Sequence, residues 1–383
     1  MKGKARLSRA VSVLTLCAML LMLIAGLLKT VLRPVDAIEY ENRPAEKLRA
    51  LTLPSYLDGS FQDSMEASLA DQVPFAVKAK KLYNIFDFAA VRGLVQRLLD
   101  KGYRYVGYRN ISFYEDALVI RPGSPWMNYE RLDAMAKRLN GYAAVPEAEF
   151  YYYYVEHDED IDFETGEKPD YCGFLRSRLQ TDDAHFGALR IHSFDGYREL
   201  FLKTDHHWNG RGAHHAYLDI CAMLGVEPVV SEGECIRECC YLGTRAAGIE
   251  GLLPEDFIVQ KYCLPEMSVH FGDQLLDGYG RTEAFLAGEE LTVSYGGIFG
   301  SDFGELVFDT GREGENLLVL GDSYDNALLL PLATCFAKTC SVDLRAYTED
   351  VGGSFDIAEY VRTHDIDKVL VVGALEYFTG RSS

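Results

Sequence analysis

The chain has 383 residues, of which 48% are hydrophobic, 12% aromatic and 25% charged. This composition is that of a folded protein, excludes a largely disordered chain, and supplies about two domains' worth of residues. Its 38 basic and 58 acidic residues give a formal net charge of −20. That charge excludes nucleic acid as an expected partner, and it argues against anionic membrane surfaces and strongly polyanionic substrates.

The N-terminal segment is basic and then apolar. Basic residues precede the uncharged stretch 10–28, which Lys29 and Arg33 close. The stretch is long enough to cross a bilayer as a helix. A cleaved signal peptide is the alternative, but the run exceeds the usual ~7–15 apolar residues and no small-residue cleavage site follows it. We predict a cytoplasmic tip and transmembrane signal anchor over residues 1–36, which places the N-terminus in the cytoplasm and the main domain outside the cell membrane.

Nine cysteines are present, and Cys17 lies in the predicted anchor. Cys235, Cys239 and Cys240 crowd together, but a single cluster with this spacing is not the pattern of a zinc site. Disulfides are compatible with a location outside the cytoplasm, and their connectivity stays open. We predict neither a metal nor a cofactor.

Helical patterns occupy the region before residue 100. Phe61, Met65 and Leu69 recur at i, i+4 and i+8, which predicts a helix with one apolar face. A second apolar-periodic helix is predicted from about residue 77 to 99. We predict that residues 37–100 form a helical stalk or cap.

Strand and helix patterns alternate from residue 101 to the end. Strands are predicted at EFYYYYVEH (149–157), ALRIHSF (188–194), NLLVL (316–320) and KVLVVGAL (368–375), and helices at AHHAYLDICAML (213–224) and FDIAEYVRTH (355–364). This alternation predicts βαβ units and a mostly parallel sheet covered on both faces. We expect the tyrosine run 151–154 to lie in its core, and residues 101–383 to form one α/β domain.

The turn Gly321-Asp322-Ser323 follows an apolar strand and precedes a helical pattern. Open α/β sheets carry their chemistry outside the carboxyl ends of the strands. Gly321 permits a tight turn, and Ser323 at the helix N-terminus would have an exposed hydroxyl close to free backbone N–H groups. The alternative is that Asp322 or Ser323 only caps the helix.

The stretch KTDHHWNGRGAHHAY (203–217) holds four of the nine histidines. Asp205 and His207 at i and i+2 in an extended segment would share one face. The carboxylate could then fix the imidazole tautomer, while the other ring nitrogen activates Ser323. The alternative is that His207 is a hydrogen-bonded core residue. His206 would point the opposite way, as a structural residue or a secondary substrate contact.

The remaining polar candidates of this region are assigned structural roles. His214 and His215 are adjacent on a predicted helix and face different directions, and no H-x-x-x-H pair is present, so a helical zinc site is unsupported. Asp343 and Arg345 follow a predicted strand, and we expect them to form a structural salt bridge.

TDHHW and GDSY together resemble the DHHW family, which is similar to the SGNH-hydrolase-like domain of alginate O-acetyltransferases. YENRP, LADQVPF and VDLR fall in that family's order between about residue 40 and the end. The resemblance implies a three-layer, flavodoxin-like sheet with helices on both faces. Ordinary SGNH hydrolases carry their serine motif first, so the motif order here is circularly permuted.

The resemblance also implies roles for individual residues. Ser323 would be the nucleophile, His207 the general base and acid, and Asp205 the carboxylate that orients it. The family's further oxyanion glycine and asparagine have no clear counterpart, and Gly297 in SYGGIFGSDFG is the candidate. Candidate oxyanion or substrate contacts are Gly321, Asp322, Tyr324, His206, Trp208 and Gly297, with Trp208 as a packing residue.

The expected activity is O-acetylation of an exported or cell-wall polysaccharide through an acyl-enzyme. The resemblance implies two partners, the polysaccharide acceptor and a membrane-bound O-acyltransferase that delivers the acyl group. The alternatives are a carbohydrate esterase with the same triad, and a non-catalytic glycan-binding or scaffold domain of an envelope assembly complex.

Overall fold

The computed structural model describes residues 2–32, 37–38, 43–72, short pieces between 82 and 98, 100–102, 105–108, 111–115, 117–120, 125–230, 234–241, 243–247, 255–261, 264–277, 279, 292–293, 295–300 and 302–381. The chain divides into two compact units. One comprises residues 1–97 and 246–252, and the other comprises residues 98–245 and 253–383.

The first unit contains helices and one short pair of strands. These are α1 (Lys2–Leu32), β1 (Ala37–Ile38), β2 (Arg43–Pro44), α2 (Leu53–Leu57) and α3 (Ser60–Gln72). Thr52 and Ser55 form a capping box at the start of α2, in which each side chain accepts a hydrogen bond from the other residue's backbone N–H. The first predicted helix corresponds to α3, whereas most of the predicted helix 77–99 lies outside the described residues.

The sequence predicts a membrane-spanning helix within residues 1–36. The structure has helix α1 over most of that range, but among the residues that it describes no helix is long and apolar enough to cross a membrane. The predicted transmembrane anchor is therefore not found among the described residues, and the location of the main domain outside the cytoplasm stays a prediction.

The second unit is built on an eight-stranded sheet with the order β11-β10-β13-β15-β14-β16-β6-β7. The bounds are β6 (Glu149–Val155), β7 (Phe186–Leu189), β10 (Ser268–Phe271), β11 (Gln274–Leu275), β13 (Glu305–Asp309), β14 (Asn316–Leu320), β15 (Lys338–Val342) and β16 (Lys368–Ala374). The five strands from β15 to β7 run parallel, and β13, β10 and β11 extend one edge antiparallel. The predicted mostly parallel sheet is confirmed.

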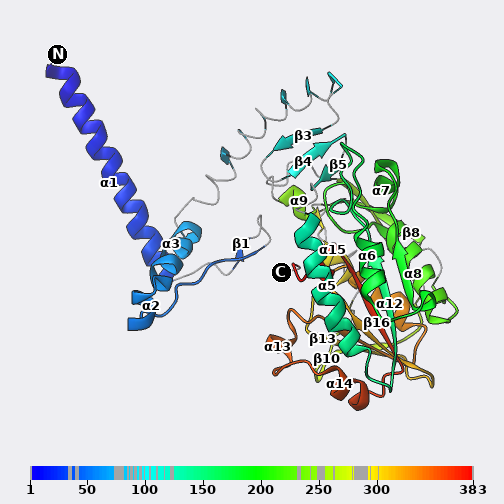
Figure 1. Ribbon diagram of the computed structural model, residues 1–383. Coiled ribbons are helices and arrows are strands. Elements are labelled where there is room, and N and C mark those ends of the chain that lie inside the picture. The colour runs from blue at the N-terminus through cyan, green and yellow to red at the C-terminus, as the bar shows by residue number, and fades with distance from the viewer. Residues whose placement is uncertain are drawn as a thin grey trace. The chain divides into compact units, whose positions relative to one another are not determined.

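Helices cover both faces of this sheet (Figure 1). They are α5 (Pro125–Tyr142), α6 (Tyr171–Arg178), α7 (Phe194–Leu200), α8 (Gly210–Leu224), α12 (Asn326–Ala333), α14 (Ile357–Thr363) and α15 (Leu375–Phe378). Tyr151 and Tyr153 pack into the core with α7, α8 and α12, while Tyr152 and Tyr154 pack on the opposite face with α5, α6 and α14. The run lies in the core, as predicted, and because strand side chains alternate between faces it fills two cores.

Smaller elements complete the unit. They are β3 (Tyr105–Tyr108), β4 (Ile111–Tyr114), β5 (Ala117–Val119), a 3-10 turn (Asp183–His185), β8 (Glu234–Tyr241), α9 (Thr244–Ala247), β9 (Glu255–Lys261), β12 (Thr292–Val293), α11 (Tyr295–Phe299) and α13 (Tyr347–Asp350). The predicted strand 188–194 is wrong beyond Leu189. Ser193 instead caps α7, because its side chain accepts a hydrogen bond from the Gly196 N–H.

Candidate active site

Ser323 lies in the turn between β14 and α12, partly exposed. A Cβ on Gly321 would lie 2.4 Å from an oxygen of the Asp325 carboxylate, so any other residue here would force the buried Asp325 side chain to move. Helix α12 begins only at Asn326, and its N-cap residue is Asp325. Ser323 therefore precedes the helix, and the alternative that Asp322 or Ser323 caps it is wrong. Asp322 is buried and accepts a hydrogen bond from the Tyr324 N–H at 3.2 Å.

The segment that carries Asp205 and His207 is a tight bend that leads into α8. The Leu202 N–H donates to the His207 carbonyl at 3.1 Å, and the Asn209 N–H donates to the Leu200 carbonyl at 2.9 Å. Asn209 then caps α8 by accepting from two backbone N–H groups of its first turn. The bend and the cap together fix His207 immediately before a rigid helix.

The structure brings the three predicted catalytic side chains together. His207 Nδ1 lies 2.8 Å from Asp205 Oδ1, and His207 Nε2 lies 2.8 Å from Ser323 Oγ. Asp205 and His207 are 1% and 4% exposed. Both distances are those of hydrogen bonds, so the arrangement allows the imidazole to take the serine proton while the carboxylate holds the ring.

Asp205 is surrounded by hydrogen-bond donors that the sequence did not reveal. Its Oδ2 accepts from the Tyr241 hydroxyl at 2.6 Å and from the Thr244 N–H at 3.0 Å, and its Oδ1 accepts from the Thr244 hydroxyl at 3.0 Å. A Cβ on Gly243 would lie 2.2 Å from the Thr204 carbonyl oxygen, so only glycine allows this approach. A glycine beside a threonine is too common a pattern to have indicated these contacts.

These surroundings set the charge states of the pair. Burial alone would raise the pKa of Asp205, but His207 and the hydrogen bonds from both histidines hold it well below its usual value. Burial, aided by the neighbouring His206, lowers the pKa of His207 to about 4. At neutral pH Asp205 is therefore a carboxylate and His207 a neutral imidazole, which are the states required for a general base and its orienting acid.

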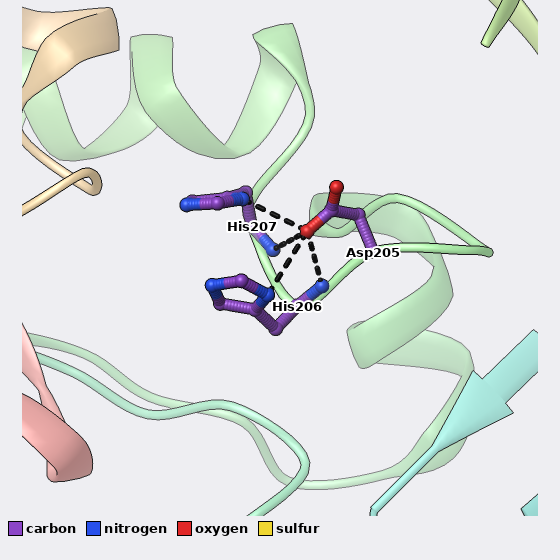
Figure 2. Close-up of side chains that lie close together, drawn as sticks. All are labelled: Asp205, His206 and His207. Carbon is purple, nitrogen blue, oxygen red and sulfur yellow. Dashed lines mark hydrogen bonds and ion pairs between the residues drawn. The ribbon is translucent and has the colours of Figure 1, made fainter. Parts of the chain in front are cut away.

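The prediction that His206 points away from His207 is wrong. Its ring lies 3.9 Å from the His207 ring between centroids, and its Nδ1 lies 3.0 Å from Asp205 Oδ1. Figure 2 shows both histidines converging on that one oxygen. The prediction was wrong because it assumed an extended segment, whereas the chain is bent. About 29% of the His206 side chain is exposed, so it can contact a bound molecule.

Asp205, His206 and His207 also offer ligand atoms within 4.8 Å of one another, as a metal site would. However, both Asp205 oxygens already accept hydrogen bonds from N–H or O–H groups. His207 Nε2 is directed at Ser323 rather than at the other two residues. A cation would have to displace these donors, so the geometry fits a hydrogen-bonded catalytic group better than a ligand set.

Aromatic residues fix the plane of the His207 ring. Tyr295 of α11 stacks on it with centroids 3.8 Å apart at 7°, and the fully buried Trp208 donates its indole N–H to the Tyr295 hydroxyl at 3.1 Å. The Tyr324 hydroxyl donates to the His206 carbonyl at 2.7 Å. Trp208 thus has a packing role, as predicted. Gly297 lies within α11, and its role in an oxyanion hole stays a prediction.

The other predicted polar residues lie outside this group. His214 packs against Tyr217, and His215 lies 3.8 Å from Asp219 on the exposed side of α8. Arg345 pairs with Asp343 at 2.6 Å, which confirms the predicted salt bridge, and with Asp302 at 2.9 Å.

A second histidine–carboxylate pair lies at the same edge of the sheet, and the sequence did not indicate it. His157 follows β6, is fully buried, and places its Nε2 2.6 Å from Glu376 Oε2. Its Nδ1 lies 3.0 Å from Asp158 Oδ1, and Asp158 pairs with Arg245 at 2.6 Å. We call His157 and Glu376 the second pair.

The solved proteins to which the structure is similar include a DHHW family protein and PatB1. It matches a DHHW family protein from Eubacterium siraeum with a TM-score of 0.53 and 15% identity, over 73% of this chain and 95% of that one. The chain shares the fold of a DHHW family protein. It also matches Bacillus cereus PatB1, solved with a sulfonyl adduct, with a TM-score of 0.54 and 19% identity, over 70% of this chain and 95% of that one. No protein-family model and no curated protein matches the chain.

Proposed function

We propose that the chain is a serine-dependent acyltransferase that moves an acetyl group to a hydroxyl of a polysaccharide. The observation that carries this proposal is the continuous hydrogen-bonded line from Asp205 through His207 to Ser323, with 2.8 Å at each step. The shared fold with a DHHW family protein and with PatB1 agrees with it. The sulfonyl adduct of PatB1 is of interest because sulfonyl reagents react with activated hydroxyl nucleophiles.

In the proposed reaction Ser323 makes and breaks the bonds to the acyl group, and His207 transfers the protons. Ser323 Oγ attacks the acyl carbonyl while His207 Nε2 takes its proton, and the leaving group departs with that proton to give an acyl-enzyme. An acceptor hydroxyl then gives its proton to His207 as its oxygen attacks the acyl carbon. The acyl ester of Ser323 breaks, and the serine oxygen recovers the proton from His207.

Water as the acceptor would make the same site an esterase, so the acceptor distinguishes the two activities. An acetyl donor ester supplied with and without oligosaccharide separates them, with mass spectrometry of the sugar as the readout. Acetylation of the sugar supports the transferase, and release of acetate alone in both mixtures leaves the esterase. The membrane-bound acyl donor partner implied by the sequence resemblance stays a prediction.

The nucleophile is tested by covalent labelling. We expect a fluorophosphonate or sulfonyl fluoride to modify the wild-type chain on the peptide that contains Ser323, and Ser323→Ala to abolish this modification together with at least ~10³-fold of the acyl-transfer rate. Ser177→Ala, on the exposed face of α6, is the matched control and should label like the wild type. A folded wild-type chain that is not labelled at Ser323 would favour the non-catalytic glycan-binding or scaffold alternative.

A further inference from the structure

The second pair lies beside the nucleophile in the order of the sheet. β16 is hydrogen-bonded to β14 on one side and to β6 on the other, and all three run parallel. Ser323 follows β14, Glu376 follows β16, and His157 follows β6. Because the carboxyl ends of neighbouring parallel strands meet at one edge, Glu376 stands between the nucleophile's turn and His157.

Tyr324 connects the two pairs. Its ring stacks with His157 at 19° with centroids 6.1 Å apart, and it lies 5.2 Å from the His207 ring. The residue directly after Ser323 therefore packs against both histidines. Burial raises the pKa of the adjacent Asp322 to about 7, and the negative charge of Glu376 adds to that rise. Glu376 is thus electrostatically close to the serine turn.

Glu376 is held firmly and is still accessible. Its partner His157 is fully buried and is itself held by Asp158, whose oxygens accept from Arg245 and from the Ile120 N–H at 2.7 Å. Nevertheless, 24% of the Glu376 side chain is exposed. A carboxylate fixed in this way is a preorganised hydrogen-bond acceptor, and it does not lose much conformational freedom when a ligand binds.

We propose that Glu376 binds a hydroxyl group of an uncharged sugar acceptor beside Ser323, with His157 as the residue that positions it. The proposal rests on the proposed acyl-transfer function and adds the acceptor class. A carboxylate only accepts hydrogen bonds, so Glu376 can bond a sugar hydroxyl but gains no hydrogen bond from the carboxylate of a uronic acid. Asp302 is a second carboxylate in this region. It accepts a hydrogen bond from the Asn326 side chain at the start of α12, and 39% of its side chain is exposed.

The basic groups beside these two carboxylates are already engaged, His157 by Glu376 and Arg345 by Asp302 and Asp343. Arg345 uses its guanidinium on Asp343, at 2.6 Å, and on Asp302, at 2.9 Å. A uronate carboxylate at this edge would therefore compete with two protein carboxylates for one arginine. Neutral oligosaccharides do not compete for Arg345, and their hydroxyl groups can donate hydrogen bonds to Glu376.

The test compares two carboxylates that are each paired with a basic side chain. Glu376 lies at the carboxyl ends of the parallel strands, and Glu315 lies at their amino ends. Glu376→Gln keeps the shape and leaves an oxygen for the His157 N–H, but it removes the charge. Glu315→Gln is the matched control, since Glu315 pairs with Lys368 at 2.6 Å at the amino ends of β14 and β16. With an acetyl ester donor and a neutral oligosaccharide, we expect E376Q to raise the acceptor KM about tenfold and to change the acceptor-saturated kcat less than threefold.

The control variant should show the wild-type KM and kcat. Equal acceptor KM values for E376Q, E315Q and the wild type would overturn the proposal. A second measurement needs no variant. The wild type should acetylate neutral oligosaccharides at least tenfold faster, in kcat/KM, than uronic-acid oligosaccharides of equal length, and equal or reversed rates would overturn the acceptor class.

Failure of this proposal can be told apart from failure of the proposed function. If Ser323 is not labelled by a fluorophosphonate, acyl transfer itself fails, and the acceptor proposal falls with it. If Ser323 is labelled and sugars are acetylated but E376Q behaves as the wild type, only the role of Glu376 and His157 is wrong.

Discussion

Two histidine–carboxylate pairs lie at one edge of the same sheet, and their chemistry is opposite. His207 faces one carboxylate and has a second histidine beside it, and its burial lowers its pKa to about 4. Burial would also lower the pKa of His157, but Glu376 and Asp158 outweigh it and raise that pKa well above the usual value. The same residue type therefore becomes a neutral base in one place and a cation in the other.

Burial lowers the pKa of both histidines, so the flanking groups decide which one can take a proton. Two carboxylates flank His157, whereas one carboxylate and a second histidine flank His207. A neutral His207 can accept one from Ser323, whereas a charged His157 can only donate a hydrogen bond and hold Glu376. One histidine at this edge of the sheet is therefore placed to react, and the other to hold a carboxylate.

The largest expected effect comes from removing the charge that orients His207. Asp205→Asn should lower kcat/KM for an acetyl ester roughly 10³–10⁴-fold, because an amide no longer fixes the Nδ1–H tautomer or stabilises the imidazolium. The rate of p-nitrophenyl acetate hydrolysis measures this. His214→Gln, on α8 but away from the site, serves as control, and a loss of less than tenfold for D205N would contradict the role of Asp205.

The second effect is on stability and distinguishes the two histidines. His157→Gln should lower the free energy of unfolding by roughly 2–4 kcal/mol, since it breaks a buried ion pair, while His207→Gln should cost about 1 kcal/mol. Because His157 binds its proton more tightly when folded, its contribution is present below about pH 6.5 and is lost as pH rises through its raised pKa.

Denaturant unfolding of both variants and the wild type at pH 6 and pH 9 checks this. The H157Q penalty should shrink at the higher pH. Equal penalties for H157Q and H207Q, or a penalty that grows as pH rises, would show that His157 is not a buried cation.

The smallest expected effect is a shift in the pH profile. The acyl-transfer rate needs neutral His207, so the acid limb should be half-maximal near pH 4 rather than near 6.5. His206 contributes to this lowering, so His206→Gln should move the limb to higher pH. The contribution of His207 to stability should fall between pH 6.5 and 4, since the unfolded chain protonates this histidine first, and the Tm of the wild type relative to that of His207→Gln measures it. An unmoved limb in H206Q would remove His206 from the electrostatics of the site.

Much of the fold was readable from local patterns. The tyrosine run correctly predicted β6, and the apolar runs before Gly321 and at 368–375 correctly predicted β14 and β16, because buried parallel strands are continuously apolar. Patterns failed where a polar residue set a boundary, as Ser193 does by capping α7. The transmembrane helix expected from the N-terminal apolar run was not found among the described residues.

The sequence by itself determined the reacting side chains as candidates, because Asp205 and His207 are neighbours in the chain and Ser323 lies in a recognisable strand-to-helix turn. The choice of His207 over His206 as the partner of Ser323 was also made from the sequence. Only the tertiary structure showed that a bend at residues 203–209 turns His206 toward Asp205 as well. Only the tertiary structure also showed that Tyr241 and Thr244 donate hydrogen bonds to Asp205, and that Glu376 pairs with His157, 219 residues away in the chain. Contacts between distant residues depend on strand order, and histidine charge depends on burial and neighbouring carboxylates, none of which a linear pattern specifies.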